Sequence, residues 1–273
     1  MVFFTAQATI YGGDDLEEVA TVSDPSIREL ARSVAVQMRA TSIIFGSPFR
    51  SRSLRNAMVC SHERFIDQPV LGTCTGFLVS ETHLLTAGHC YLGGPMNPCA
   101  EMSWVFDYEA DGAATQFQAT SDQVYGCRRL VELSYRGDLD YAIVELDRPV
   151  VGRTPLRLSS SPRVSPLQTI FSIHSPRGLP LKYSTGFVRA DDSQNSFLSA
   201  IDLMRGSSGA PIFDAVTREV LGIVAQGDHD YETQEAPEFC NAFKRCGEWE
   251  CRGERSTRVY RVPVSWPSSE PRR

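Results

Sequence analysis

The stretch LMRGSSGAPIF, residues 203–213, places two adjacent serines between two glycines, immediately before an apolar segment. Such a turn of small residues leading into a strand is common in all-β proteins, and alone it indicates only a loop. A serine hydroxyl becomes a nucleophile where a base removes its proton and an acid orients that base. The question is whether the rest of the chain supplies a histidine and a carboxylate.

Two other segments supply these groups. In LLTAGHC, residues 84–90, His89 follows an apolar strand and three small residues, which leave room for another segment beside its ring. In GDLDYAIVELD, residues 137–147, Asp140 directly precedes an apolar run. A carboxylate at a buried strand end needs a hydrogen-bond donor, and an imidazole N–H would serve. Asp138 is the weaker candidate because it does not adjoin the strand.

In the order His89, Asp140 and Ser208, with TAGHC and GSSGAP as they stand, the chain resembles the chymotrypsin-like serine endopeptidases. It is most similar to their secreted bacterial branch, which includes the V8-type glutamyl endopeptidases. The segment IYGGDDLEEV, residues 10–19, resembles the start of mature chains in that branch, although Leu16 replaces the usual arginine. The resemblance implies two antiparallel β-barrels packed face to face, with the active site in the cleft between them.

The same resemblance decides between the two serines. In this family the nucleophile follows a glycine by two residues, and the N–H groups of both form the oxyanion hole. Gly206 and Ser208 fit this spacing, whereas Ser207 does not because Arg205 stands where its glycine would be. Ser207 also occupies the position at which trypsin-type zymogens carry an aspartate that receives the new N-terminus. That activation switch is therefore not expected here.

Substrate preference follows from a second set of positions. Asp202 lies six residues before Ser208, where trypsin-like enzymes carry the acid that attracts arginine or lysine. Val224 stands where glutamyl endopeptidases carry the histidine that binds glutamate. With Gln226 and Gly227, these two residues form the expected substrate pocket. We predict cleavage after arginine or lysine rather than glutamate, with Asp202 as a purely structural acid as the alternative.

The eight cysteines are even in number, which in a chain of this size indicates an oxidising compartment and up to four disulfides. The resemblance implies a disulfide between Cys74 and Cys90, and the pairing of the other six stays open. A zinc site among Cys240, Cys246 and Cys251 is disfavoured because their segment has no C-x-x-C and no histidine. We expect neither a metal nor a cofactor.

Short apolar runs alternate with turn signals from about residue 40 onwards, which predicts an all-β fold. The expected strands lie within residues 75–90, 141–147, 167–175, 210–214 and 218–227, and residues 24–38 are a short helix or a helix-to-strand transition. The Ser- and Pro-rich segment 154–167 is the best internal boundary. We expect an N-terminal barrel over residues 9–157 and a C-terminal barrel with a cysteine-containing tail over residues 158–273.

The composition of the chain indicates where the protein works and which kinds of partner it can bind. With 27 Lys and Arg against 33 Asp and Glu, the net charge is −6, and no basic block attracts nucleic acid or an anionic membrane. No apolar run is long enough for a transmembrane helix. Ala6-Gln7-Ala8 has the form of a signal-peptidase site, so residues 1–8 are interpreted as a remnant of a signal or pro-segment, with a frayed terminus as the alternative. We expect a secreted monomer acting on peptides or proteins.

Two other classes of protein fit the same residues less well. An α/β-hydrolase needs G-x-S-x-G, but Ala210 occupies the last position, and no βαβ pattern is present. A catalytically inactive binding protein with a trypsin-like fold would normally lack a triad member, and all three are present. His62, His83 and His174 match no motif position and are expected to be structural. We therefore predict a serine endopeptidase that hydrolyses peptide bonds through an acyl-enzyme.

Overall fold

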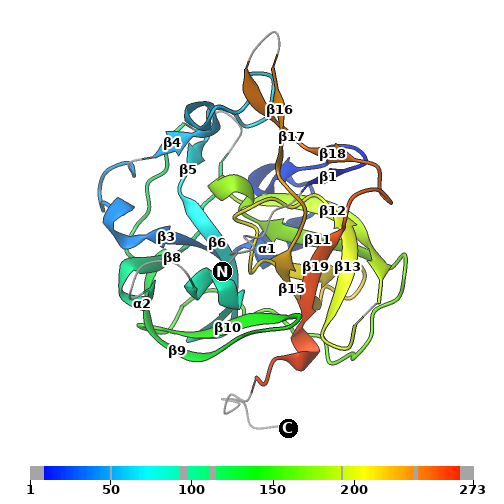
Figure 1. Ribbon diagram of the computed structural model, residues 1–273. Coiled ribbons are helices and arrows are strands. Elements are labelled where there is room, and N and C mark those ends of the chain that lie inside the picture. Colours follow the sequence, from blue (N-terminus) through cyan, green and yellow to red (C-terminus); the bar gives the residue numbers. More distant parts are fainter. Residues whose placement is uncertain are drawn as a thin grey trace.

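The computed structural model describes residues 9–49, 51–92, 98–110, 115–191, 193–235 and 239–264 (Figure 1). The segment interpreted as a signal or pro-segment remnant, residues 1–8, lies outside the described residues. No helix among the described residues is long and apolar enough to cross a membrane.

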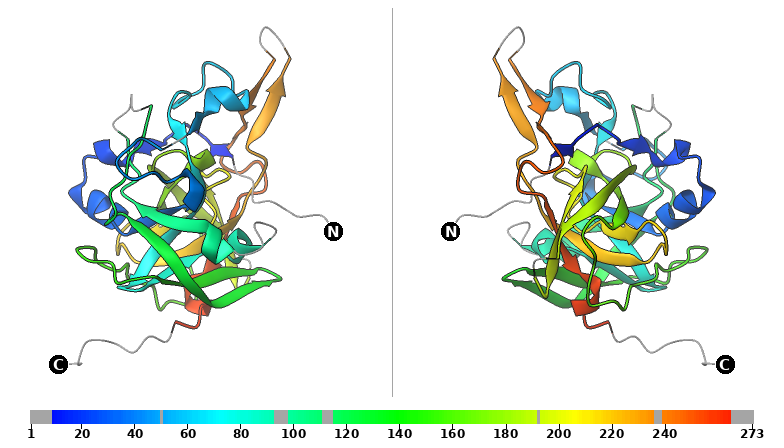
Figure 2. Two further views of the ribbon diagram at one scale, coloured as in Figure 1. Left: turned by 90° about the vertical axis from the view of Figure 1, so that its left-hand side faces the viewer. Right: turned by 90° about the vertical axis from the view of Figure 1, so that its right-hand side faces the viewer.

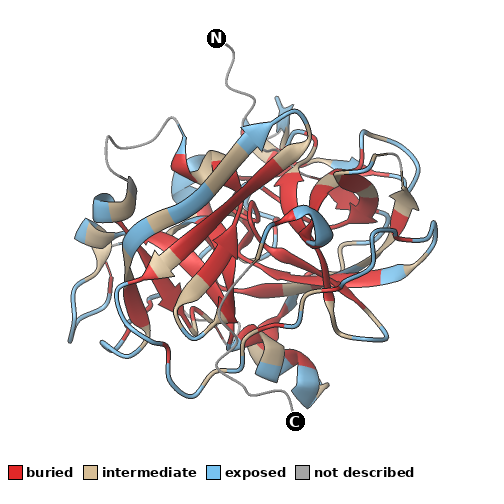
Figure 3. Ribbon diagram, turned by 90° about the horizontal axis from the view of Figure 1, so that it is seen from below, coloured by how far each residue is buried: buried red, intermediate tan, exposed pale blue. Residues whose placement is uncertain are grey.

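The first half of the chain forms a closed antiparallel barrel with the strand order β10-β7-β6-β3-β8-β9. Its strands are β3 (Val34–Arg39), β6 (Gly72–Ser80), β7 (His83–Thr86), β8 (Met102–Phe106), β9 (Val124–Arg136) and β10 (Leu139–Leu146). β6, β8 and β10 are almost wholly buried, whereas β9 is exposed or half-buried along most of its length (Figure 3). Continuous apolar runs such as β8 fit strands that are covered on both faces.

The second half forms a six-stranded antiparallel barrel that closes by the pairing of β11 with β12. Its strands are β11 (Thr169–His174), β12 (Lys182–Ala190), β13 (Ser196–Ile201), β14 (Pro211–Asp214), β15 (Val220–Gln226) and β19 (Glu254–Arg258). The expected all-β fold of two antiparallel barrels is therefore confirmed. The two barrels lie side by side, the first blue to green and the second mainly yellow to red (Figure 1).

The barrels share hydrophobic contacts. One cluster of buried residues includes Phe77 of the first barrel and Phe171 and Phe213 of the second. The rings of Phe171 and Phe213 stack with their centroids 4.6 Å apart. Burying aromatic rings from both halves in one cluster fixes the barrels against each other, which keeps the residues between them in register.

Short elements complete the fold. The helices are α1 (Pro25–Ala31) and α2 (Pro98–Glu101), with 3₁₀ turns η1 (Val19–Thr21), η2 (Ala40–Ser42), η3 (Leu54–Ala57), η4 (Gly88–Tyr91), η5 (Pro176–Gly178) and η6 (Val259–Arg261). Two hairpins pair β4 (Arg52–Ser53) with β5 (Pro69–Val70) and β16 (Tyr231–Gln234) with β17 (Cys240–Phe243). Because α1 is capped by Asp24 and precedes β3, the predicted helix-to-strand transition is confirmed.

The N-terminal segment does not join the first barrel, although we expected residues 9–157 to form one unit. β1 (Ile10–Tyr11) pairs with β18 (Arg245–Cys246), and β2 (Glu17–Glu18) pairs with β12 of the second barrel. Figure 1 shows β1 beside β18. The contact between β2 and β12 includes a buried ion pair in which Lys182 Nζ lies 2.8 Å from Glu18 Oε2. A division of the chain after residue 157 would therefore separate β1 and β2 from the strands with which they pair.

All eight cysteines form disulfides. The structure pairs Cys74 with Cys90, as the resemblance implies, and the remaining pairs are Cys60–Cys240, Cys99–Cys127 and Cys246–Cys251. The Cys60–Cys240 bond joins residues 180 apart in sequence and ties the β16–β17 hairpin, at the end where Gln234 pairs with Cys240, to the first half of the chain. That hairpin projects from the body in both side views (Figure 2).

Candidate active site

The structure brings His89 and Asp140 into direct contact. His89 Nδ1 lies 2.6 Å from Asp140 Oδ2, and Asp140 Oδ1 accepts a hydrogen bond from the His89 backbone N–H at 2.9 Å. A carboxylate at Nδ1 holds the proton on that nitrogen and leaves Nε2 as the acceptor. The imidazole thus has the tautomer that a general base requires.

Local sequence explains how the pair meets. His89 lies in η4, directly after β7, and Asp140 lies in β10, which pairs with β7. At Gly88 a Cβ atom would lie 2.3 Å from the Ser134 carbonyl oxygen and 3.1 Å from Asp140 Oδ1. Only glycine fits where these segments come so close together, which explains why the residue before His89 has no side chain.

A second-barrel residue that the sequence did not single out also holds Asp140. The Asp140 backbone N–H donates to Thr257 Oγ1 at 3.0 Å, across the junction of the barrels. The rival acid, Asp138, instead accepts hydrogen bonds from Asn195 Nδ2 at 2.8 Å and from the hydroxyls of Ser193 and Ser196. Asp138 therefore anchors the loop before β13 and is not hydrogen-bonded to the histidine.

The backbone N–H groups in the loop of residues 203–210 differ in whether they have a hydrogen-bond acceptor within the described chain. Five of the N–H groups from residues 204–210 donate hydrogen bonds within the described chain: Met204 to Ser207 Oγ, Arg205 to Asp230 Oδ1, Ser207 to the Met204 carbonyl, Gly209 to the Val224 carbonyl and Ala210 to the Ser207 carbonyl. Among the described residues, the N–H groups of Gly206 and Ser208 have no such acceptor. These are the two groups that the sequence assigns to an oxyanion hole.

The backbone at Gly206 explains this pattern. Gly206 has a φ of +100°, and a Cβ atom there would lie 2.6 Å from the Ser175 carbonyl oxygen. Its own carbonyl accepts from Thr75 Oγ1 at 2.9 Å, which fixes the peptide orientation from the first barrel. A side chain at residue 206 would be strained and would clash, so the loop geometry depends on glycine.

Ser208 lies beside the histidine loop. Its carbonyl oxygen accepts from the Thr75 backbone N–H at 2.8 Å and lies 3.9 Å from the sulfur of Cys90, the residue after His89. The hydrogen bonds of the described residues include none between Ser208 and His89. In free enzymes the hydrogen bond between nucleophile and base is often long and shortens when substrate binds. A missing hydrogen bond between Ser208 and His89 among the described residues is therefore compatible with such a pair.

His174, which matches no catalytic motif, contacts this loop through a hydrogen bond to Ser207. His174 Nδ1 lies 2.7 Å from Ser207 Oγ and its Nε2 lies 3.1 Å from Ser184 Oγ. Ser184 Oγ donates to the Asp202 carbonyl at 3.0 Å, so it accepts from His174 Nε2–H. Ser207 Oγ accepts from the Met204 N–H at 3.1 Å and is left to donate to Nδ1. One neutral imidazole therefore satisfies the whole chain of hydrogen bonds.

Burial keeps His174 neutral. The side chain is fully buried, and burial together with the positive charge of Lys182 lowers the pKa of His174 from 6.5 to about 3. Burial likewise lowers the pKa of Lys182 to about 8, although its ammonium donates to Glu18, Gln68 and the Pro180 carbonyl. A charged imidazole in this place would face a cation in a poorly solvated interior.

We expect this histidine to make stability depend on pH. Between pH 6.5 and 3 the unfolded chain binds a proton at His174 that the folded chain does not. The free energy of unfolding contributed by the neutral imidazole is therefore complete above pH 6.5 and lost as the pH falls toward 3, by about 1.4 kcal/mol per pH unit at most. Urea unfolding of the wild type and of His174→Gln between pH 7 and 4 measures it.

Glutamine keeps one acceptor and one donor at that place but does not titrate. The wild type should lose more stability than His174→Gln on acidification, so the difference between their unfolding free energies should change steadily with pH. The matched control is His62→Gln, because the His62 side chain is 60% exposed. Parallel stability curves for the wild type and His174→Gln would contradict a buried neutral histidine.

Asp202 does not lie where the sequence placed it in a substrate pocket. Its Oδ1 accepts from the Tyr11 backbone N–H at 2.7 Å and its Oδ2 accepts from the Asp15 backbone N–H at 3.3 Å. The residue is buried, and burial raises the pKa of its carboxyl to about 8. The carboxyl thus braces the N-terminal segment against the active-site loop, which corresponds to the structural alternative given above. The physical reason is that β1 occupies the space into which it points.

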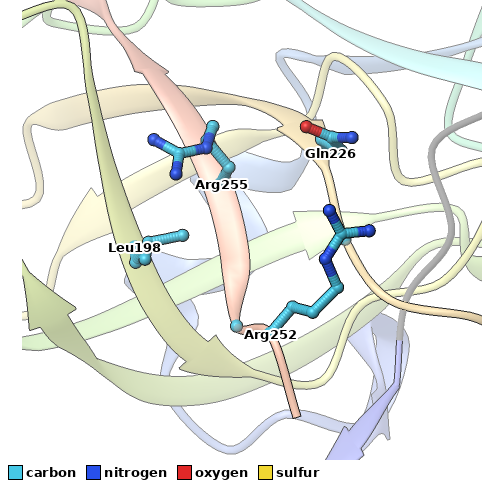
Figure 4. Close-up of a pocket in the computed structure, with 6 residues that line it drawn as sticks. Leu198, Gln226, Arg252 and Arg255 are labelled. Atoms are coloured by element: carbon cyan, nitrogen blue, oxygen red, sulfur yellow. The ribbon is translucent and has the colours of Figure 1, made fainter. Parts of the chain in front are cut away.

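Two cavities that share Gln226 and Arg255 lie on this side of the molecule, and the larger one is lined by His89 and Asp140. One, of about 280 Å³, is lined by His89, Tyr135, Gly137, Asp138, Asp140, Ala225, Gln226 and Arg255. The other, of about 60 Å³, is lined by Leu198, Gln226, Gly227, Arg252, Gly253 and Arg255 (Figure 4). Of the expected pocket residues, Gln226 and Gly227 line these cavities, whereas Val224 is a buried core residue and is not part of either lining.

The sulfur atoms near His89 do not make a metal site. Cys74, Cys90 and His89 have ligand-type atoms within 4.8 Å of one another, but the two sulfurs are joined in a disulfide. Thiolates are the form of cysteine that binds metals, and a disulfide offers none. The cysteines of the tail are likewise paired, Cys240 with Cys60 and Cys246 with Cys251.

Comparison with known proteins agrees with this architecture. Residues 74–223, more than half of the chain, match the family model described as the trypsin-like peptidase domain. The chain therefore belongs to the trypsin-like peptidase family. No curated protein matches it significantly in sequence.

Two solved structures of bacterial proteins have similar folds. The Vibrio cholerae VesB protease has 16% sequence identity and a TM-score of 0.53, over 90% of this chain and 64% of that one. The inactive form of a serine-to-alanine mutant of Mycobacterium tuberculosis Rv3671c has 14% identity and a TM-score of 0.50, over 92% and 91%. At such identities the likeness extends to the fold alone, and the resemblance to the V8-type branch stays a prediction.

Proposed function

We propose that this protein is a serine endopeptidase with Ser208 as nucleophile, His89 as general base and Asp140 as the acid that orients it. The observation that carries the proposal is the pattern of backbone N–H groups in the loop of residues 203–210. Its other N–H groups from residue 204 onwards have acceptors, while those of Gly206 and Ser208 have none among the residues that the structure describes. Backbone donors without internal acceptors suit an anion that forms only during reaction.

The reaction begins when Ser208 Oγ attacks the carbonyl carbon of the scissile peptide and its proton passes to His89 Nε2. The tetrahedral oxyanion accepts hydrogen bonds from the N–H groups of Gly206 and Ser208. The C–N bond then breaks, the leaving amine takes the proton from His89, and an acyl-enzyme remains. A water molecule, deprotonated by His89, attacks the ester, and the acid product leaves with Ser208 restored.

Asp140 acts through the histidine. Its contact with Nδ1 at 2.6 Å holds the tautomer and stabilises the imidazolium that forms when the proton is transferred. Its second oxygen holds the backbone of the same residue, so the ring has little freedom to turn away. The proton itself stays on the imidazole throughout.

A fluorophosphonate probe tests the proposal directly. The probe reacts with an activated serine, so we expect covalent labelling at one site, with the added mass on the peptide that contains Ser208. Labelling should disappear in Ser208→Ala and after prior heat denaturation. A folded protein that takes up no label would point to the inactive binding protein with the same fold.

We also infer that the protein works outside the cytoplasm. All of its eight cysteines are in disulfides, and such bonds persist in oxidising compartments. Its partners are then peptides or proteins met in that environment. Recovery of the disulfide-bonded protein from the culture medium of its natural source, rather than from cell lysate, would support this location.

A further inference from the structure

The backbone of Arg205, immediately before Gly206, is held by residues from outside the loop of residues 203–210. The Arg205 carbonyl oxygen accepts a hydrogen bond from the Arg177 backbone N–H at 2.5 Å, and the Arg205 N–H donates to Asp230 Oδ1 at 3.0 Å. Arg205 is exposed, whereas the residues on either side of it are buried. The loop is therefore fixed at this point through its backbone, by residues from two other segments.

The first of these contacts controls the direction of the Gly206 N–H. The Arg205 carbonyl and the Gly206 N–H belong to one planar peptide group, and in a trans peptide they point in opposite directions. Glycine permits a wide range of φ angles, so Gly206 does not by itself fix this plane. Because the Arg177 N–H holds the carbonyl on one side, the Gly206 N–H is directed to the other side, where no described residue accepts it.

Arg177 is itself kept in place by Asp230. Arg177 Nη1 lies 2.7 Å from Asp230 Oδ2, and the two side chains are only 20% and 4% exposed. Arg177 has a φ of +55°, a region that residues with a Cβ atom adopt where surrounding contacts compensate for the strain. The carboxylate thus binds the guanidinium with one oxygen and the Arg205 N–H with the other. One ion pair therefore fixes both backbone groups of Arg205.

Asp230 is anchored at the start of the β16–β17 hairpin. It directly precedes β16, and its carbonyl oxygen accepts from the Lys244 N–H at 2.8 Å. The Arg177 guanidinium carbon lies 4.7 Å from the centre of the Tyr231 ring, and that ring stacks on Phe243 of β17 with the centroids 5.6 Å apart. The carboxylate therefore has little freedom to leave the loop, although the hairpin itself projects from the body (Figure 2).

We propose that Arg177 and Asp230 are positioning residues of the oxyanion hole, and that their ion pair holds the peptide between Arg205 and Gly206 so that the Gly206 N–H points at the oxyanion. This inference rests on the proposed endopeptidase function and deepens it. Neither residue acts on the reacting atoms directly, because both act through Gly206. A misdirected N–H weakens binding of the charged transition state more than binding of the neutral substrate carbonyl. The loss should therefore appear in kcat.

Hydrolysis of one fluorogenic peptide by Asp230→Ala and Arg177→Gly tests the inference. Glycine keeps the backbone N–H and adopts a φ of +55° without strain, so Arg177→Gly removes only the guanidinium side chain. We expect kcat per active site to fall by about 10- to 100-fold, less than when an oxyanion-hole donor is deleted outright, with KM within about threefold of the wild type. Active sites are counted by fluorophosphonate labelling of Ser208 run to completion.

Further variants separate positioning from a general loss of stability. Asp230→Asn keeps an oxygen for the Arg205 N–H, so it should recover part of the kcat that Asp230→Ala loses. The double variant Arg177→Gly/Asp230→Ala should be no slower than the slower single variant, because both changes remove the same ion pair. The matched control is Asp107→Ala, which breaks the ion pair of Asp107 with Arg153 in the first half of the chain. It should lower the free energy of unfolding and leave kcat per active site within about threefold of the wild type.

The positioning role is overturned if Asp230→Ala and Arg177→Gly keep the wild-type kcat per active site, if only KM changes, or if Asp107→Ala loses as much kcat. Thermal unfolding shows which variants are folded, and if Asp230→Ala is not, Arg177→Gly and Asp230→Asn are judged by the same criteria. A wild type that takes up the label while the variants match its kcat overturns the positioning role alone. A wild type that takes up no label overturns the endopeptidase function as well.

Discussion

Replacing Ser208 with alanine is expected to lower kcat for peptide hydrolysis by about 10⁵- to 10⁶-fold, because the members of such a triad act as a unit. The serine oxygen is the attacking atom, and neither His89 nor the loop N–H groups can substitute for it. Initial rates at saturating peptide, with an active-site titration of the wild type, give the ratio. Binding of substrate should be nearly unaffected, so the loss should appear in kcat rather than in KM.

Ser207→Ala is the matched control, one residue away. Its hydroxyl links the Met204 N–H to the neutral His174, so its loss leaves buried groups without partners. We expect a fall in unfolding free energy of about 1–3 kcal/mol and a far smaller loss of kcat. If Ser207→Ala abolished proteolysis while Ser208→Ala retained it, the nucleophile would be misassigned.

Asp140→Asn is expected to lower kcat by about 10⁴-fold without unfolding the protein. The amide oxygen can still accept from the His89 backbone N–H, but the amide NH₂ then faces Nδ1 and makes that nitrogen an acceptor. The proton moves to Nε2, and the base is lost. Stopped assays across pH 6–9, with thermal unfolding measured in parallel, separate the catalytic loss from instability.

The control for this variant is Asp138→Asn. That carboxylate serves Ser193, Asn195 and Ser196, so its replacement should reduce stability and leave kcat within about tenfold of the wild type. A greater loss of kcat in Asp138→Asn than in Asp140→Asn would transfer the orienting role to Asp138.

The sequence was sufficient for those parts of the fold and candidate site that depend on short segments. The apolar runs around β7, β10 and β11 predict strands by themselves, and His89 and Asp140 stand at strand ends next to small residues. The pairing of His89 with Asp140 followed from the motif order. Such features are local, so a single sequence contains them.

Contacts between distant segments were not predictable in this way. His174 ends an apolar run, which signals a buried polar group in need of partners, but nothing in the sequence identifies Ser207 and Ser184 as those partners. Asp202 matched a motif position, yet its carboxyl is taken by Tyr11 and Asp15. The smaller cavity lies partly in the tail, where no familiar spacing marks it.

The link between the two ends of the chain determines when the site can assemble. Tyr11 and Asp15 leave the ribosome early, yet the Asp202 carboxyl that they bind is made far later, and β18 later still. Pairings between such distant residues form slowly because loop closure comes first. A chain interrupted during synthesis before Asp202 lacks both Ser208 and the carboxyl that binds Tyr11 and Asp15. The proposed hydrolytic site can therefore assemble only after nearly the whole polypeptide is available.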